Sequence, residues 1–186
     1  MAFFPDLSFG WLNGWIVLAL LALAEGICFA VFPKDVVQRL WDRSGWSQKQ
    51  VVYTVIAKLF ALVCLTLLVL TPLKREKAVF WVGSALAAMG LVGVVTALLN
   101  FRNTPFDQPV ARGLYRVSRH PQIVMASLVL LGGTIAVGSW AAVVALIAAR
   151  VFGHLSIVAE EEVCLRQYGD AYRGYMERVP RYFVLL

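Results

Sequence analysis

The stretch that decides the fold is PQIVMASLVLLGGTIAVGSWAAVVALIAARVFGHLSIVA, which covers Pro121–Ala159. Its 39 residues carry one formal charge, on Arg150. A single helix of this length would measure ~58 Å, about twice the ~30 Å hydrocarbon thickness of a bilayer. Gly138-Ser139 lies near its middle, where a helix is expected to break. The stretch therefore predicts two short helices folded as a tight hairpin, over 121–137 and 139–159.

Three further apolar stretches, 11–33, 51–71 and 78–100, are also long enough to cross a bilayer. The chain has 186 residues, of which 60% are hydrophobic and 15% charged, a composition typical of membrane proteins rather than soluble domains. We predict an all-α integral membrane protein with about five transmembrane helices in one domain, 1–186. Because residues 1–10 contain no Lys or Arg, we expect the first apolar stretch to be retained and not removed as a signal peptide.

The basic residues outside these stretches predict the orientation of the chain. Segments 34–50, 101–120 and 160–186 lie on one side and hold four Lys or Arg residues each, twelve in all. The other side holds three, all in 72–77. The positive-inside rule then places the N-terminus outside and the C-terminus in the cytoplasm, and we expect a prokaryotic inner membrane. The net charge of +6 reflects this topology and lipid head groups rather than nucleic acid.

Small residues and cysteines indicate packing rather than cofactor chemistry. Gly83, Ala87 and Gly90 share one side of the third stretch with Val94, a spacing that lets helices approach closely in lipid. No GxGxxG motif supports a Rossmann domain. The cysteines are odd in number and far apart, so we expect reduced packing residues rather than a disulfide framework or a metal site; they are Cys28, Cys64 and Cys164.

Two polar clusters flank the hairpin. The upstream cluster ends at Arg119, His120 and Pro121 and also contains Arg112, Gly113, Tyr115 and Arg116. The downstream cluster contains Glu160, Glu161 and Glu162, followed by Arg166 and Tyr168. A hairpin returns its end near its start, so both clusters should meet at one end of the helix pair. Pro121 suits the first turn of a helix, and three successive carboxylates point around a helix, so that one or two can face the site.

Further polar side chains continue this site into the membrane and into the tail. Arg150 and His154 share one helix face, and we expect Arg150 to pair with Glu25 or with a substrate anion. Glu25 and Lys58 are expected to be structural, as a pair or by snorkelling. The different depths of His120 and His154 argue against haem or another metal site. The tail, 160–186, predicts a helix ended by Pro180 with one apolar face: Leu165, Tyr168, Tyr172, Tyr175 and Val179.

These clusters resemble a known family. The pattern Gly113-x-Tyr115-x-x-x-Arg119-His120-Pro121, followed after the hairpin by Glu161-Glu162-x-x-Leu165-x-x-Tyr168-Gly169-x-x-Tyr172-x-x-Tyr175, is similar to the isoprenylcysteine carboxyl methyltransferase and phospholipid methyltransferase superfamily. The resemblance covers about residues 100–182. It departs from the family at Ile123 and Met125, where relatives usually have an aromatic residue and a glycine.

The resemblance implies an integral membrane methyltransferase that uses S-adenosylmethionine in a cytoplasmic pocket covered by the tail. Its acceptor would be lipid-like or hydrophobic and would enter from the bilayer: an isoprenylcysteine-type carboxylate, a phospholipid amine or a thiol. The residues that match cofactor-binding positions are Tyr115, Arg119, His120, Pro121, Glu161, Glu162, Tyr172 and Tyr175. Arg150 and Glu161 are the candidates for catalysis.

Two other functions remain open from the sequence. Membrane reductases that use NADPH on sterol-like substrates carry a similar Arg-His-Pro turn, usually followed by Asn-Tyr. Gln122-Ile123 and the glutamates after the hairpin favour the methyltransferase over this alternative. A non-enzymatic membrane scaffold that has kept the fold is the second.

Overall fold

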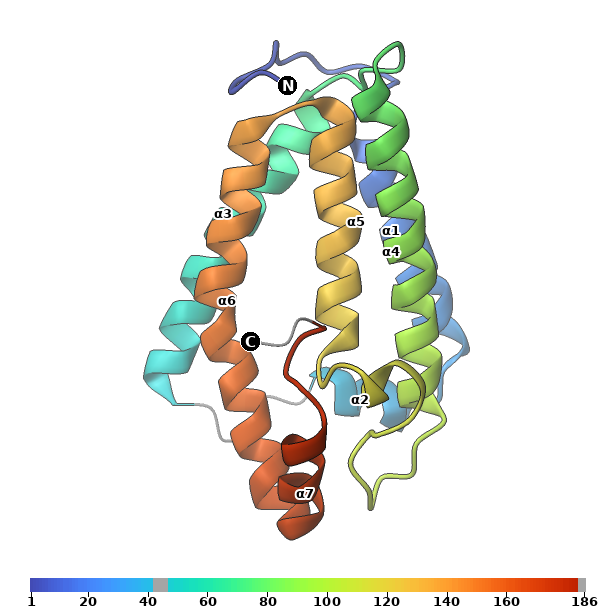
Figure 1. Cartoon of the computed structure of the whole chain (residues 1–186), viewed down its shortest axis with the longest axis vertical. Coiled ribbons are helices and arrows are strands. Elements are labelled where there is room, and N and C mark those ends of the chain that lie inside the picture. Colours follow the sequence, from blue (N-terminus) through green and yellow to red (C-terminus); the bar gives the residue numbers. More distant parts are fainter. Residues whose placement is uncertain (42–46, 184–186) are drawn as a thin grey trace.

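Helices are the extended regular elements of the chain in the computed structural model, which describes residues 1–41 and 47–183 (Figure 1). In chain order they are α1 (Trp15–Val31), α2 (Lys34–Trp41), α3 (Gln48–Leu70), α4 (Ala78–Arg102), the short 3-10 helix η1 (Gly113–Arg116), α5 (Pro121–Val137), α6 (Trp140–Tyr168) and α7 (Asp170–Arg178). The predicted all-α class is confirmed.

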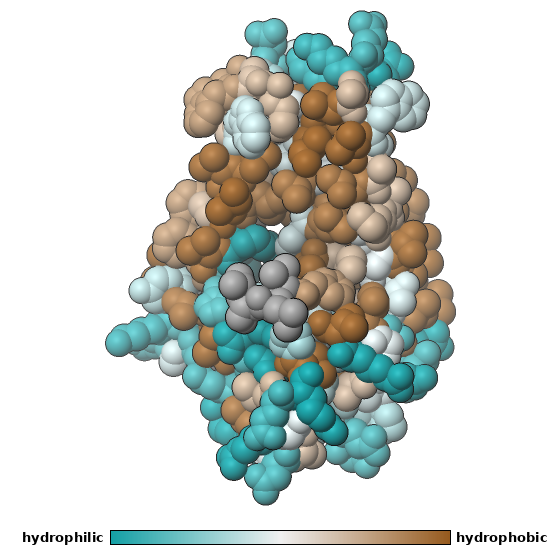
Figure 2. All heavy atoms as spheres, viewed as in Figure 1, coloured by the Kyte–Doolittle hydropathy of each residue, from teal (hydrophilic) through white to brown (hydrophobic). Residues whose placement is uncertain are grey.

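The apolar helices occur where the sequence predicted them. Within the described residues, α3, α4 and α6 are long and apolar enough to cross a membrane, and α1 and α5 are shorter apolar helices of 17 residues each. Figure 2 shows an apolar band across the middle of one face, with hydrophilic residues gathered at the two ends. This distribution is that of a membrane protein.

The hairpin breaks at the predicted dipeptide. Gly138 has a φ of 72°, a left-handed conformation that favours glycine, and it ends α5. Ser139 then caps α6, since its hydroxyl accepts a hydrogen bond of 3.2 Å from the backbone N–H of Ala142. The predicted end of the second arm at Ala159 is wrong. Glutamates are good helix formers, and α6 continues to Tyr168, where Gly169 with a φ of 56° stops it.

The segment before α1 lies across the tip of the hairpin (Figure 1). Backbone carbonyls of Ala2 and Phe3 accept hydrogen bonds of 2.9 and 3.0 Å from Trp140 and Ala141. These bonds pair N–H groups in the first turn of α6 that have no partner within the helix. At the opposite end of the bundle lie η1, α2 and α7.

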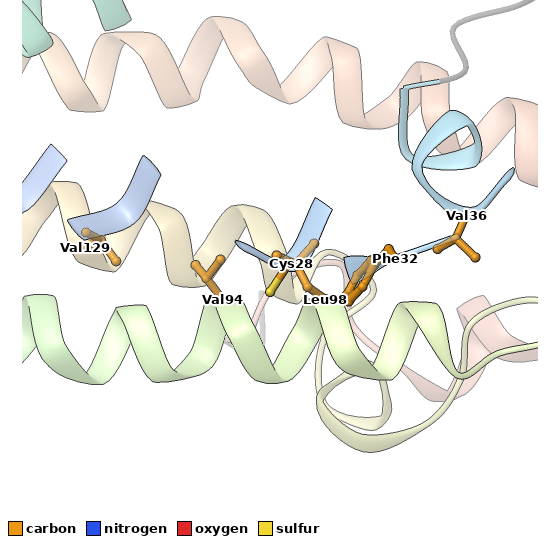
Figure 3. Packing of buried hydrophobic residues seen from close by; sticks show 6 residues of the cluster. All are labelled: Cys28, Phe32, Val36, Val94, Leu98 and Val129. Atoms are coloured by element: carbon orange, nitrogen blue, oxygen red, sulfur yellow. The ribbon is translucent and has the colours of Figure 1, made fainter. Parts of the chain in front are cut away.

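Glycines bring α4 and α5 into close contact. A Cβ atom at Gly83 would fall on the backbone of Gly132 and Ala136, and one at Gly132 would fall on the backbone of Gly83 and Ala87. This confirms the packing predicted from the spacing in 83–94. Beside this interface lies a core of six buried residues (Figure 3). Three come from α1, the residue after it and α2, namely Cys28, Phe32 and Val36, and three come from α4 and α5, namely Val94, Leu98 and Val129.

The two arms of the hairpin pack on different partners. Helix α5 lies against α4, whereas α6 runs along α3. Figure 1 shows α5 and α6 joined at the tip and diverging toward the other end, where the segment after α7 passes between them. The site is built in this region.

We predict that Gly83→Ala destabilises the protein by about 1–3 kcal/mol, because its methyl group would meet fixed backbone of α5. Gly26→Ala in α1 is the matched control. A Cβ at Gly26 meets no atom within 4 Å, so the higher helix propensity of alanine should leave stability unchanged or raised. Thermal unfolding of the detergent-solubilised protein measures both, and equal midpoints for the two variants would contradict the proposed close packing.

Candidate functional site

The start of α5 presents the upstream cluster as predicted. Pro121 occupies the first helical turn and His120 is the capping residue before it. The backbone N–H of His120 donates to Ser118 Oγ at 3.2 Å, and that of Arg119 donates to the carbonyl of Pro180 at 2.9 Å. The turn is therefore fixed both locally and by the segment that follows α7.

A buried carboxylate, that of Glu161 on α6, lies at the centre of the site. Its side chain is 3% exposed. Arg119 Nε lies 2.9 Å and His120 Nε2 3.2 Å from Oε1, and Arg181 Nη2 donates to Oε2 at 2.6 Å. Three basic side chains thus surround one carboxylate, which favours its ionised form. The predicted meeting of the two clusters is confirmed for Arg119, His120 and Glu161.

The three successive glutamates point in three directions, as their helical spacing requires. Glu160 Oε2 lies 3.6 Å from His120 Nδ1, and the Glu160 side chain is 43% exposed. Glu162 instead accepts a hydrogen bond of 3.0 Å from Gln50 Nε2 on α3. Glu160 and Glu161 therefore face the Arg-His-Pro turn, and Glu162 links α6 to α3.

The tyrosines of α7 close the network beneath the turn. Tyr172 and Tyr175 are buried with their ring centroids 5.7 Å apart, and they pack with Leu165, Tyr168 and Val179 on the predicted apolar face. Tyr175 Oη donates to the carbonyl of Tyr115 at 2.7 Å. Burial raises the pKa of Tyr172 and of Tyr175, so both hydroxyls stay neutral and can donate.

Tyr115 belongs to the same network from the side of η1. It is buried, and its hydroxyl accepts a hydrogen bond of 2.9 Å from Gln122 Nε2. Its carbonyl is the acceptor for Tyr175. Tyr115 therefore connects α7 to the first turn of α5.

The sequence prediction missed the residues after Pro180. Arg181 pairs with Glu161, and its carbonyl accepts from Ser118 Oγ at 3.0 Å. Tyr182 Oη lies 2.8 Å from His154 Nδ1, and Arg181 Nη1 lies 3.4 Å from His154 Nε2. Tyr182 and Arg181 thus contact the two ring nitrogens of His154. Nothing in the sequence distinguishes Arg181 from the other basic residues of the tail.

A cavity of about 730 Å³ lies beside this network, between α3, α5, α6 and the segment after α7. Figure 2 shows the face hollowed between α6 and α5 at this level. The polar residues that line the cavity include Lys58, Ser127, Arg150, His154, Glu160 and Tyr182. A second hollow of about 510 Å³ has an apolar lining between α5 and α6 and shares Arg150 with the first.

One of the two partners predicted for Arg150, the carboxylate of Glu25, does not contact it. Arg150 forms no ion pair with Glu25, which lies on α1, and instead faces α5: its Nη1 donates to Ser127 Oγ at 3.3 Å. The pairing with Glu25 is therefore wrong, because α1 packs chiefly against α4. A pair between Glu25 and Lys58 is also not found; both residues lie in the described part of the chain.

The two positions that depart from the resembled pattern have clear surroundings. Ile123 lines the larger cavity. Met125 lies in the α4–α5 interface, where a Cβ at Gly93 would fall on its side chain. The glycine at 93 thus provides the space that methionine fills at 125.

Fold and site together define a helical membrane protein with a polar centre at one end of the bundle and a cavity that reaches apolar surface. Residues 78–171, half of the chain, match the phospholipid methyltransferase family, and the chain belongs to that family. The matched range contains both predicted clusters. No curated protein and no solved structure gives a significant match to the chain.

We predict that Glu161→Gln lowers stability by about 3 kcal/mol or more, because the nearly buried Arg119 loses its carboxylate. Loss of the pair should also release the segment after α7, so that trypsin cleaves faster at Arg178 and Arg181. Thermal unfolding and timed proteolysis measure the two effects. Glu162→Gln is the control, since its bond to Gln50 is exposed and lies outside this network. Equal effects of both substitutions would show that Glu161 is not the centre.

Proposed function

We propose that the chain is an S-adenosylmethionine-dependent methyltransferase that acts on a lipid-like acceptor from the bilayer. The observation that carries the proposal is the contact of Arg119 and His120 with Glu161 next to a cavity that opens between membrane helices. Membership in a methyltransferase family supports the reaction class.

The groups around the cavity fit this cofactor by their chemistry. S-adenosylmethionine combines a sulfonium and an ammonium cation with a carboxylate and an adenosine. Glu160 offers a half-exposed carboxylate at the cavity wall, and Arg181, 29% exposed, is a cation at the same end. The cavity volume of about 730 Å³ is in the range of small-molecule sites. When bound, the cofactor would supply the methyl group.

Of the eight predicted cofactor-binding residues, His120 would lie nearest the cofactor in this proposal. It would do so together with Glu160, which lines the cavity, and Arg181, neither of which was predicted to bind the cofactor. The others would hold these side chains in place: Tyr115, Arg119, Pro121, Glu161, Tyr172 and Tyr175. Glu162, which is bound to Gln50 on the α3 side, would not contribute.

Methyl transfer requires mainly that the two reactants are held in line, and the chain would provide that orientation. A carboxylate or thiolate acceptor needs no strong base. An amine acceptor must lose a proton, and the carboxylate of Glu160 is exposed enough to take it. Glu161 is engaged by three basic side chains, so we assign it a positioning role rather than the predicted catalytic one.

The orientation of the chain in this proposal follows the basic residues of the sequence. The site end, which carries η1 and α7, would face the cytoplasm, where S-adenosylmethionine is made. The N-terminal segment would lie outside. The single domain would comprise residues 1–186, with the tail covering the cofactor.

Calorimetry on the purified protein tests the proposed cofactor. We expect heat of binding with S-adenosylmethionine and S-adenosylhomocysteine and none with NADPH. Binding of NADPH alone would favour the reductase, and binding of none of the three would favour a scaffold.

A pair of neighbouring substitutions tests the placement of this cofactor site. Glu160→Gln should weaken S-adenosylmethionine binding at least tenfold, because one cation of the ligand loses its carboxylate. Glu162→Gln should leave the affinity unchanged. Calorimetry in neutral detergent measures both variants, and an unchanged affinity for Glu160→Gln would refute the placement.

A further inference from the structure

We propose that Arg39 of α2 is a positioning residue of the candidate site, which holds the connecting segment, residues 103–112, in place and through it sets the position of Tyr115. The ordering of this segment is a property of the fold alone, whereas the effect of Arg39 on a ligand rests on the proposed function. Arg39 lies outside residues 78–171, so the family match contains no information about it. It does not line the cavity either, so its effect on the site passes through other residues.

The first observation is the number of hydrogen bonds that the guanidinium of Arg39 donates. Its Nη1 donates to the carbonyls of Thr104 and Pro105 at 3.4 and 3.3 Å. Its Nη2 donates to the carbonyl of Gln108 at 3.1 Å and to Tyr168 Oη at 2.8 Å. The connecting segment contains no helix, so its carbonyls lack the partners that a helix provides. One side chain thus supplies donors for three carbonyls of the segment that joins α4 to η1.

The second observation is that two aromatic rings lie against the same guanidinium. The Cζ of Arg39 lies 5.1 Å from the ring centroid of Phe101, near the end of α4, and 5.0 Å from that of Phe106 in the connecting segment. A planar guanidinium can contact rings with its face and donate hydrogen bonds from its edge, whereas the ammonium of lysine cannot reproduce this geometry. These contacts therefore require an arginine and not merely a positive charge at this end of the bundle.

The third observation is that Arg39 also reaches the end of α6. The hydroxyl of Tyr168 accepts from Arg39 and donates to the carbonyl of Phe106 at 3.3 Å. Tyr168 is the last residue of α6, and it packs with Tyr172 and Tyr175 of α7. Arg39 thus joins α2, the connecting segment and the junction of α6 with α7, which are far apart in the sequence but lie at the same end of the bundle (Figure 1).

The connecting segment leads directly into the site. It is followed by η1, which begins at Gly113, and Tyr115 of η1 bonds to both α5 and α7. The carbonyl of Tyr115 accepts from Tyr175 of α7, and its hydroxyl accepts from Gln122 in the first turn of α5. The position of Tyr115 therefore depends on how the segment before it is held, and the side chain that holds this segment is Arg39.

Removal and chemical replacement of the guanidinium test the proposal. The full-length protein in neutral detergent is compared with Arg39→Ala and Arg39→Lys by hydrogen exchange over residues 103–116 and by calorimetry with S-adenosylhomocysteine. We expect both substitutions to speed exchange in this range and to weaken binding about tenfold, since lysine cannot replace the fork of donors. Millimolar guanidinium chloride, far below the molar range in which it unfolds proteins, should restore both properties to Arg39→Ala. Ammonium chloride should restore neither.

Two further variants serve as controls. Lys34→Ala is the matched one, because Lys34 is an exposed cation on the same helix, and it should leave exchange and affinity unchanged. Tyr168→Phe keeps the ring but removes the hydroxyl between Arg39 and the carbonyl of Phe106. It should speed exchange over residues 103–116 to a smaller extent, and it tests the segment if Arg39→Ala does not fold.

The outcomes separate this proposal from the proposed function. If the wild type binds no S-adenosylhomocysteine, the proposed function fails, and exchange with its rescue by guanidinium still decides whether Arg39 orders the segment. Faster exchange with unchanged affinity would limit Arg39 to a structural role and overturn the proposal. It would also be overturned by wild-type behaviour of Arg39→Lys, by a loss of affinity that guanidinium does not restore, or by unchanged exchange in Tyr168→Phe.

Discussion

The interaction on which the rest of the structure depends is the buried contact of Glu161 with Arg119, His120 and Arg181. A carboxylate that is 3% exposed is stable only when its charge and lone pairs are matched. The three partners come from the start of α5 and from the segment after α7, so this one requirement joins parts of the chain that are far apart in sequence. It also holds residues 179–183 across the opening between α5 and α6.

That opening is itself a consequence of helix packing. Gly83 and Gly132 allow the backbones of α4 and α5 to approach closely, whereas α6 packs along α3. The two arms of the hairpin are therefore held by different partners and diverge from their common tip (Figure 1). The small residues of α5 draw it toward α4 and away from α6, and this separation leaves a cavity. Charged residues of α6, Arg150 and Glu160, line that cavity.

The sequence predicted those features that depend on spacing along one or two helices. The break at Gly138, the helix start at Pro121 and the meeting of Arg119 and His120 with Glu161 all follow from local geometry. Three features could not be predicted in this way. Which glutamate faces the turn depends on the rotation of α6, the role of Arg181 depends on a return of the chain after α7, and the surroundings of Arg150 depend on the placement of α1.

The charged residues of α6 lie at two levels of the helix, and their surroundings differ. Residues Glu160 and Glu161 lie where the helix leaves the apolar band, so their charges are matched by basic side chains from the end of the bundle. Arg150 lies ten residues earlier on α6, and no carboxylate of residues 1–41 and 47–183 forms an ion pair with it. A charge inside an apolar helix is costly, and the hydrogen bond of 3.3 Å from Arg150 Nη1 to Ser127 Oγ is one contact by which α5 accommodates it.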